Sequence, residues 1–160
     1  MPQSTEQILH PEKYLAAEAP QLVSLPPLTD TLGADWALVK ENVLGEFYLR
    51  EYLAGQLPTS TAVPAAAGWG GDQFAVYHQP STGEVVLMLG VVWDSTADLE
   101  EFTAAFATFA TNRTAAEPTT PHPTTVCWET NNLALCLIVQ QGQTTVVRAP
   151  TLDIALRLTP

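Results

Sequence analysis

The spacing of hydrophobic and polar residues changes several times along the chain, and each change marks an expected element. Alternation over 35–45, "DWALVKENVLG", predicts a strand. Over 46–57 the spacing becomes helical and places three leucines on one face, which predicts a helix. A second short helix is expected over 59–68, capped by Ser60 or Thr61 and closed by Gly68 in the left-handed conformation that glycine adopts freely.

The next part of the chain predicts a hairpin followed by a long helix. "QFAVYHQ" and "EVVLMLGVVW" are expected to pair around the turn "PSTG". The helix over 96–112 begins with a capping-box pattern, Ser95 followed by Asp98. Its apolar residues recur at helical spacing and are expected to be core rather than a cofactor site. This stripe consists of Leu99, Phe102, Phe106 and Phe109.

The remaining segments predict a loop, three strands and a final helix. The Pro/Thr-rich stretch 114–123 is expected to be a loop. "TTVCWET", "LALCLIVQQ" and "TTVVRAP" are expected strands linked at "NN" and "QG", and "TLDIALRL" is an expected helix. Because hairpins join most of the strands, the predicted fold class is α+β, with a mainly antiparallel sheet and helices packed on it. A doubly wound parallel sheet would need a helix between nearly every pair of strands.

Residues 1–30 are expected to form an extended arm before a single domain over 31–160. Five prolines in this stretch disfavour a long helix and leave one short helical turn around "STEQIL". We expect the arm to dock on the domain through apolar anchors, and it is the element best placed to reach a neighbouring subunit. The expected anchors, which are also the candidate interaction residues, are Ile8, Leu9, Tyr14, Leu22, Val23 and Leu25.

The charge of the chain excludes some classes of partner. Seventeen acidic residues against six scattered basic ones give a net charge of −11, which disfavours binding to nucleic acid and to anionic membranes. No apolar run reaches the 18 or so residues that a membrane span needs, so membrane insertion is not expected. The first residues also lack the basic and apolar regions of a signal peptide.

No catalytic, cofactor-binding or metal-binding residue is predicted. In "GWGGDQF" the glycines follow a helix and precede a strand, the reverse of a phosphate loop, so we expect a sharp turn in which Asp72 bonds the turn amides. The three histidines are far apart in the sequence, and neither HExxH nor GxSxG occurs. These observations indicate that the chain is not an enzyme by itself.

Three segments nevertheless form a distinctive set: "PQSTEQILHPEKYLA", "NVLGEFYLREYL" and "AAAGWGGDQFAVY" with "VVWDSTADLEEFTAAF". Together they resemble the C-terminal portion of bacterial zinc metallopeptidase-like proteins, whose HExxH helix lies upstream of such a segment. The resemblance covers nearly the whole chain, but the metal ligands and the general-base glutamate lie in the part that this sequence lacks. Met1 therefore begins either a shortened chain or a free-standing relative of the accessory domain.

The resemblance leaves two functions of different class. The first is a non-catalytic accessory domain that binds a protein partner or itself. The alternative is a small enzyme or ligand-binding protein that uses a pocket between the sheet and the helices. The secreted character of the resembling proteins favours an extracytoplasmic location.

Two cysteines complete the candidate residues. If "NN" is a two-residue hairpin turn, Cys127 lies directly opposite Cys136. Both side chains would share a face with Glu129, where an oxidant could reach them. A cross-strand disulfide is expected if the protein is exported, as the resemblance suggests, and free thiols are expected in a reducing cytosol.

Overall fold

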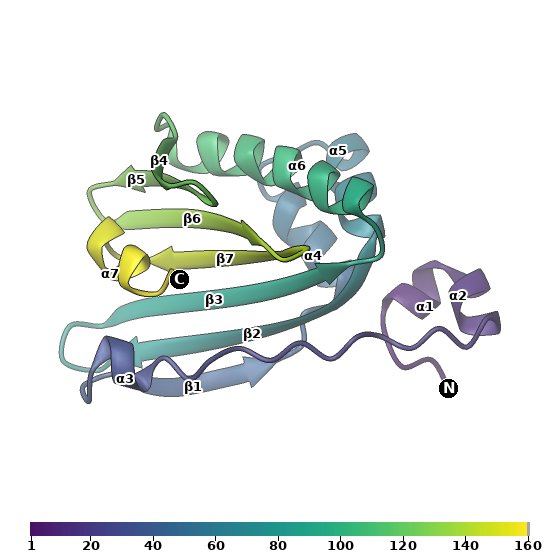
Figure 1. The fold of residues 1–160 in the computed structure, drawn as a ribbon, viewed down its shortest axis with the longest axis horizontal. Coiled ribbons are helices and arrows are strands. Elements are labelled where there is room, and N and C mark those ends of the chain that lie inside the picture. The colour runs from purple at the N-terminus through teal and green to yellow at the C-terminus, as the bar shows by residue number, and fades with distance from the viewer. Residues whose placement is uncertain (160) are drawn as a thin grey trace.

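A computed structural model describes residues 1–159, which form one antiparallel sheet between two layers of helices and loops (Figure 1). The helices span Glu6–Leu9 (α1), Pro11–Leu15 (α2), Thr29–Leu32 (α3), Gly45–Ala54 (α4), Thr59–Ala67 (α5), Thr96–Thr114 (α6) and Leu152–Arg157 (α7). The strands span Ala37–Asn42 (β1), Trp69–Gln79 (β2), Glu84–Trp93 (β3), Thr119–His122 (β4), Thr125–Thr130 (β5), Leu133–Gln140 (β6) and Gln143–Ala149 (β7).

The seven strands follow the order β1-β2-β3-β7-β6-β5-β4, and every neighbouring pair is antiparallel. Strands β2 and β3 form the expected hairpin around residues 80–83, where Gly83 has a φ of +76° that favours glycine. The predicted α+β class with a mainly antiparallel sheet is therefore confirmed. Strand β4 was not expected, because its proline and two threonines are typical of a loop.

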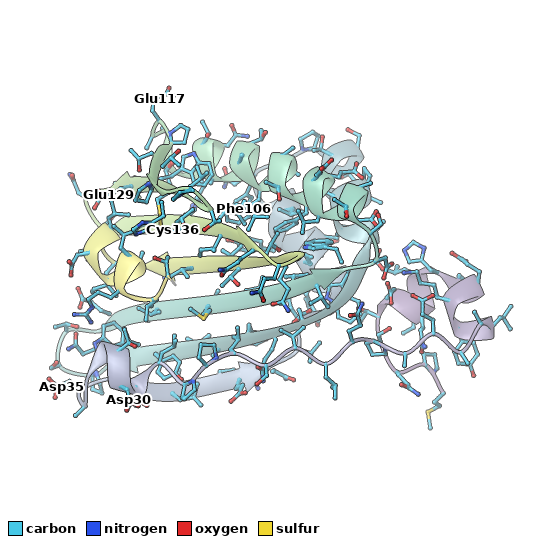
Figure 2. The ribbon with its side chains drawn as sticks, viewed as in Figure 1. Asp30, Asp35, Phe106, Glu117, Glu129 and Cys136 are labelled. Carbon is cyan, nitrogen blue, oxygen red and sulfur yellow. A yellow bond between two sulfur atoms is a disulfide. The ribbon has the colours of Figure 1, made fainter. Side chains whose placement is uncertain are left out.

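Helices α4, α5 and α6 cover one face of the sheet, which we call the helical face. The expected stripe of α6 is buried here against residues of β3, β5, β6 and β7. Phe106 is fully buried, with its ring centroid 5.7 Å from that of Phe102 and 6.2 Å from that of Trp128 (Figure 2). Ser95 caps the helix as predicted, since its hydroxyl accepts a hydrogen bond from the Asp98 amide.

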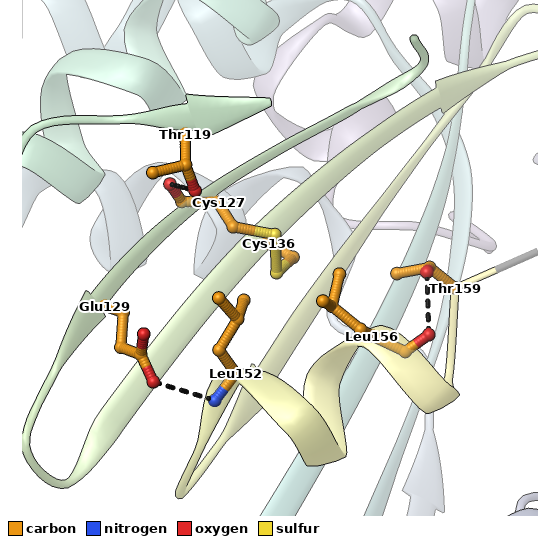
Figure 3. Close-up of a disulfide and its surroundings, with 7 residues drawn as sticks. All are labelled: Thr119, Cys127, Glu129, Cys136, Leu152, Leu156 and Thr159. Carbon is orange, nitrogen blue, oxygen red and sulfur yellow. Dashed lines mark hydrogen bonds between the residues drawn. A yellow bond between two sulfur atoms is a disulfide. The ribbon is translucent and has the colours of Figure 1, made fainter. Parts of the chain in front are cut away.

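The opposite face, the arm face, is covered by α3, α7 and part of the arm. Its core includes Leu28, Trp36, Met88 and the two cysteines. Cys127 and Cys136 are paired in the hairpin register and joined by a disulfide, with their Cα atoms 4.1 Å apart (Figure 3). The expectation that an oxidant could reach them is wrong, because α7 lies over this part of the sheet and both residues are at most 1% exposed.

The glycine-rich stretch forms strand rather than a turn. Strand β2 already begins at Trp69, which is 1% exposed, and a bulge lies between Trp69 and Gly71. Gly68 ends α5 with a φ of −90°, so the expected left-handed cap is wrong. The expected cap from Ser60 or Thr61 is also wrong, because the helix begins after Pro58 without a side-chain cap.

The arm is extended only in its second half. Residues 6–15 contain two short helices, α1 and α2, where a single helical turn was expected, and the chain then runs extended toward α3 (Figure 1). His10 separates the two helices, and Pro11 starts α2 at a position where proline is well tolerated. None of the helices within residues 1–159 combines the length and the apolar character needed to cross a bilayer.

Candidate functional site at the junction of the arm and α4

The junction is organised around the buried carboxylate of Asp72 on β2. Its Oδ1 accepts a hydrogen bond from the Leu44 amide at 2.6 Å, and its Oδ2 accepts from the Gly45 amide at 2.7 Å and from the Trp69 indole at 2.6 Å. Two of these donors belong to the start of α4, where backbone amides have no partner within the helix. Asp72 therefore holds the beginning of α4 against β2, instead of bonding the amides of its own turn as expected.

Burial raises the pKa of Asp72, although the bonds from Leu44, Gly45 and Trp69 act in the opposite direction. The residue is 3% exposed, and both of its oxygens already accept hydrogen bonds. A carboxylate in this state is poorly suited to take a proton from a substrate, because its lone pairs are committed to the fold. Its role is structural.

A histidine–glutamate pair joins the arm to α4. The Nε2 atom of His10 lies 3.0 Å from Oε1 of Glu46. The Glu46 residue is only 3% exposed. Burial raises the pKa of Glu46, while the hydrogen bond with His10 lowers it. The second oxygen of Glu46 has no hydrogen-bond partner within the described residues 1–159.

Lys13 forms a second charged link between the arm and the domain. Its Nζ lies 2.6 Å from Oε1 of Glu6 and 3.3 Å from Oε1 of Glu18, and it also bonds Asp94 at the end of β3. The three carboxylates stand close enough to suggest a metal site, but the lysine ammonium already contacts all of them. Burial disfavours its charge, yet the bonds to Asp94 and Glu6 outweigh this and raise the pKa of Lys13.

A cleft of about 700 Å³ opens between the first residues of the arm and the turn from β1 to α4. Ser4, Thr5, Val43 and Tyr48 stand on its walls, and Glu41 and Asp72 are the charged residues among those that line it. The lining therefore suits a neutral or cationic group better than an anion. Of the lining hydroxyls, that of Ser4 accepts a hydrogen bond from the Gln7 amide, which places it in the fold of α1.

The space between the sheet and the helices is much smaller. An apolar cavity of about 100 Å³ lies there, lined by residues that include Leu44, Tyr52 and Phe74. Pockets for small molecules usually measure about 300–1,000 Å³. This cavity does not provide the ligand pocket that the alternative function requires.

The exposed apolar residues are unevenly distributed. Within residues 1–159, all the large apolar side chains that are exposed belong to the first 52 residues, and 53–159 contribute none. Five of them lie in the arm. The others belong to β1, α4 and the turn between them, and we call them the β1–α4 strip: Leu38, Val39, Val43, Phe47, Tyr48 and Tyr52.

Residues 36–158 match the family described as "Domain of unknown function (DUF8575)". The chain belongs to this family. The matched region begins at Trp36 and contains β1, α4 and the whole sheet, so the arm precedes the DUF8575 region. Comparisons with curated proteins and with solved structures gave no match.

The expected arm anchors divide into two groups. Leu9, Val23 and Leu25 are half-buried, whereas Ile8, Tyr14 and Leu22 are exposed and do not anchor the arm on this chain. The polar residues Glu6 and Gln7 are buried in their place. Their contacts with Lys13 and the Glu18 carbonyl lie within the arm itself.

Sequence reasoning missed the charged contacts between the arm and the DUF8575 region. His10 and Glu46 are 36 positions apart, and Lys13 and Asp94 are 81 apart. Residues so far apart in the chain leave no pattern in the local sequence that would predict their contact. The one available signal was composition, since a buried lysine or glutamate requires a partner of opposite charge.

Proposed function

We propose that the chain is a non-catalytic interaction domain, accessory to metallopeptidase-like proteins, that binds a protein partner or a second copy through the β1–α4 strip. The observation that carries the proposal is the concentration of exposed large apolar side chains in residues 1–52. Apolar side chains that are exposed together in one region of a protein surface commonly mark a binding site. Aromatic residues are enriched in such sites, and the strip contains Phe47, Tyr48 and Tyr52.

The edge position of β1 supports the same surface. All six residues of β1 are exposed, and its outer backbone groups face no neighbouring strand in the described sheet. Such an edge can accept an additional strand from another chain. The other edge, β4, is less suited, because it has four residues and one of them is Pro121.

The charges of β1 disfavour two of the registers in which a second copy could pair at this edge. Two copies of β1 that pair antiparallel around a twofold axis at Lys40 would place lysine opposite lysine. An axis at Glu41 would place glutamate opposite glutamate. Like charges directly opposite one another destabilise a strand pair. A partner strand with an acidic residue facing Lys40, or a basic residue facing Glu41, avoids this cost.

The proposal is tested by capture of a partner with a substituted strip. Full-length chain carrying Val43→Glu and Tyr48→Glu is compared with wild type in partner capture followed by identification of the bound protein, and in sedimentation velocity. Ala104→Glu, which adds a charge at an exposed position of α6, is the matched control. We expect a protein that binds wild type and the control to be lost from the strip variant. The proposal is contradicted if the wild type, the strip variant and Ala104→Glu bind the partner equally. It is also contradicted if the wild type neither self-associates nor captures a reproducible partner.

The cleft supports a second candidate, the binding of a small neutral or cationic ligand. Its volume of about 700 Å³ lies within the usual range for such sites. A thermal-shift screen of the wild type and of Glu41→Gln tests it. A compound that stabilises the wild type and loses its effect in Glu41→Gln would favour this candidate over the interaction domain.

A further inference from the structure

The extended half of the arm packs on the arm face of β2 and β3, along a track of residues that we call the groove: Gly70, Gly71, Gln73, Tyr77 and Gly90. It runs in the same direction as β2 (Figure 1). The Gln21 amide donates to the Gly70 carbonyl at 2.7 Å, the Leu25 amide to Oε1 of Gln73 at 2.6 Å, and the Leu28 amide to the Tyr77 hydroxyl at 3.1 Å. The seven positions that separate Gln21 from Leu28 thus match the seven positions that separate Gly70 from Tyr77.

Two glycines make room for the arm. A Cβ at Gly71 would overlap the Gln21 carbonyl, so no other residue fits beside the arm backbone at this point. A Cβ at Gly90 would lie 3.0 Å from Cδ2 of Leu25 and 3.4 Å from Cγ1 of Val23. The groove is therefore shaped to an extended chain with apolar side chains at alternate positions.

The bulge in β2 supplies the first hydrogen bond of the groove. Because the pairing of β2 with β3 shifts between Trp69 and Gly71, Gly70 has no partner in the strand register. Its carbonyl accepts from Gln21 instead. The side chains of Gln73 and Tyr77 supply the other two acceptors, so the groove has three fixed acceptors for the amides of a passing chain.

Between Gln21 and Pro27 the contacts that hold the arm in this groove are few, whereas Leu28 beyond them is buried in the core of the arm face. The three hydrogen bonds contribute about 0.5–1.5 kcal/mol each, and Val23 and Leu25 are only half-buried. Leu22, directly before Val23, is fully exposed. A segment with few buried apolar contacts and an exposed backbone opens at a small fraction of the free energy of global unfolding.

We propose that this groove, formed by Gly70, Gly71, Gln73, Tyr77 and Gly90, also receives the arm of a second copy, so that two chains exchange arms. The exchanged dimer rebuilds the same contacts, and for this reason exchange of an identical element is a low-cost route to dimers. The groove residues lie inside the family region 36–158, and the arm precedes it. This interface is separate from the β1–α4 strip, and the proposal does not depend on it.

The connection between arm and domain permits the exchange. The turn after α3 contains the exposed Gly33, which has a φ of +99°. Few residues other than glycine adopt this backbone conformation. Backbone rotation there would redirect the arm together with α3, so that Leu28 and Leu32 leave the core of one chain and are buried again on the other.

Cysteine trapping tests the exchange with full-length chains. Chains carrying Val23→Cys and chains carrying Gly90→Cys are mixed over a range of protein concentrations in an oxidising glutathione buffer, and disulfide-linked heterodimers are measured on non-reducing gels. The matched control replaces Val23→Cys by Leu22→Cys, whose side chain points into solvent. The double variant Val23→Cys/Gly90→Cys, in one chain, reports the arm that lies in its own groove.

Arm exchange predicts a heterodimer whose yield rises with protein concentration and exceeds that of the Leu22→Cys control at least severalfold. The double variant should close an intrachain disulfide at low concentration. If the double variant closes and the mixture yields no more heterodimer than the control, the arm stays in its own groove and the proposal is overturned. If the double variant does not close, the arm does not occupy the groove at Gly90, which overturns it equally.

Discussion

The indole of Trp69 donates a 2.6 Å hydrogen bond to the carboxylate of Asp72, three residues further along the same strand. Both residues are buried, and the same carboxylate binds the first amides of α4. This arrangement connects the bulge of β2 to the beginning of α4. It fixes the position from which Phe47 and Tyr48 project.

Asp72→Ala is expected to lower the free energy of unfolding by about 3 kcal/mol or more, because three buried donors lose a charged acceptor. Urea denaturation of the full-length chain measures this loss. Asp35→Ala removes an exposed acid and should change stability by less than about 0.5 kcal/mol. A similar, small effect of both substitutions would show that Asp72 does not organise the junction.

The buried Glu46 predicts a specific pH dependence. Its pKa lies above the ordinary value of 4.5 because of burial, so the folded state holds the proton to higher pH than the unfolded chain does. The contribution of Glu46 is most favourable below pH 4.5 and is lost as the pH rises through the raised pKa. Glu46→Gln has no such proton, so its stability relative to wild type should increase as the pH is raised from 4 to 8. A stability difference that stays constant across this range would contradict the raised pKa.

Phe106→Ala is expected to cost about 3–5 kcal/mol, as for other fully buried aromatic residues. Phe106 packs between Phe102 and Phe109 on α6 and meets Trp128 on β5. Thr108→Ala, at an exposed position of the same helix, serves as control. Calorimetric unfolding of both variants measures the difference. A loss below about 0.5 kcal/mol for Phe106→Ala would mean that the stripe is not core.

The sequence predicted those features that depend on local spacing. The stripe of α6, the hairpin of β2 and β3, and the register of Cys127 opposite Cys136 all follow from a fixed period or a short turn. Strand β4 was missed, because its pairing with β5 has to overcome a composition typical of loops. Pairing with β5 therefore determines the structure of this segment, against the loop preference of its own residues.

The candidate site was beyond sequence reasoning because its contacts are distant in the chain. "GWGG" was interpreted as a turn, yet Gly71 is required by the approach of Gln21, 50 positions earlier. The exposure of Leu22 and the burial of Glu6 follow from how the arm crosses the sheet, which no period in the sequence encodes. From apolar character alone, Leu22 is expected to be buried and Glu6 to be exposed.

Reduction of the disulfide should lower stability by about 2.5–3 kcal/mol, the loop-closure entropy for the short segment between Cys127 and Cys136, which are nine positions apart. Because both cysteines are buried, a thiol reductant should act slowly on the folded chain and rapidly in denaturant. Time-resolved thiol counting in the two conditions measures this. Two thiols that react with a labelling reagent in denaturant without prior reduction would show that the bond is absent.

The most direct test of the interaction function is amide hydrogen exchange on β1 in the presence of a bound chain. A peptide selected against the full-length protein from a displayed random library serves as the bound chain. Binding through the β1–α4 strip predicts slower exchange at the outward-facing amides of Ala37–Asn42. This protection should be lost in Val43→Glu/Tyr48→Glu and kept in Ala104→Glu. Protection confined to β4, to the cleft or to the groove under the arm, with exchange on β1 unchanged, would contradict the proposed function.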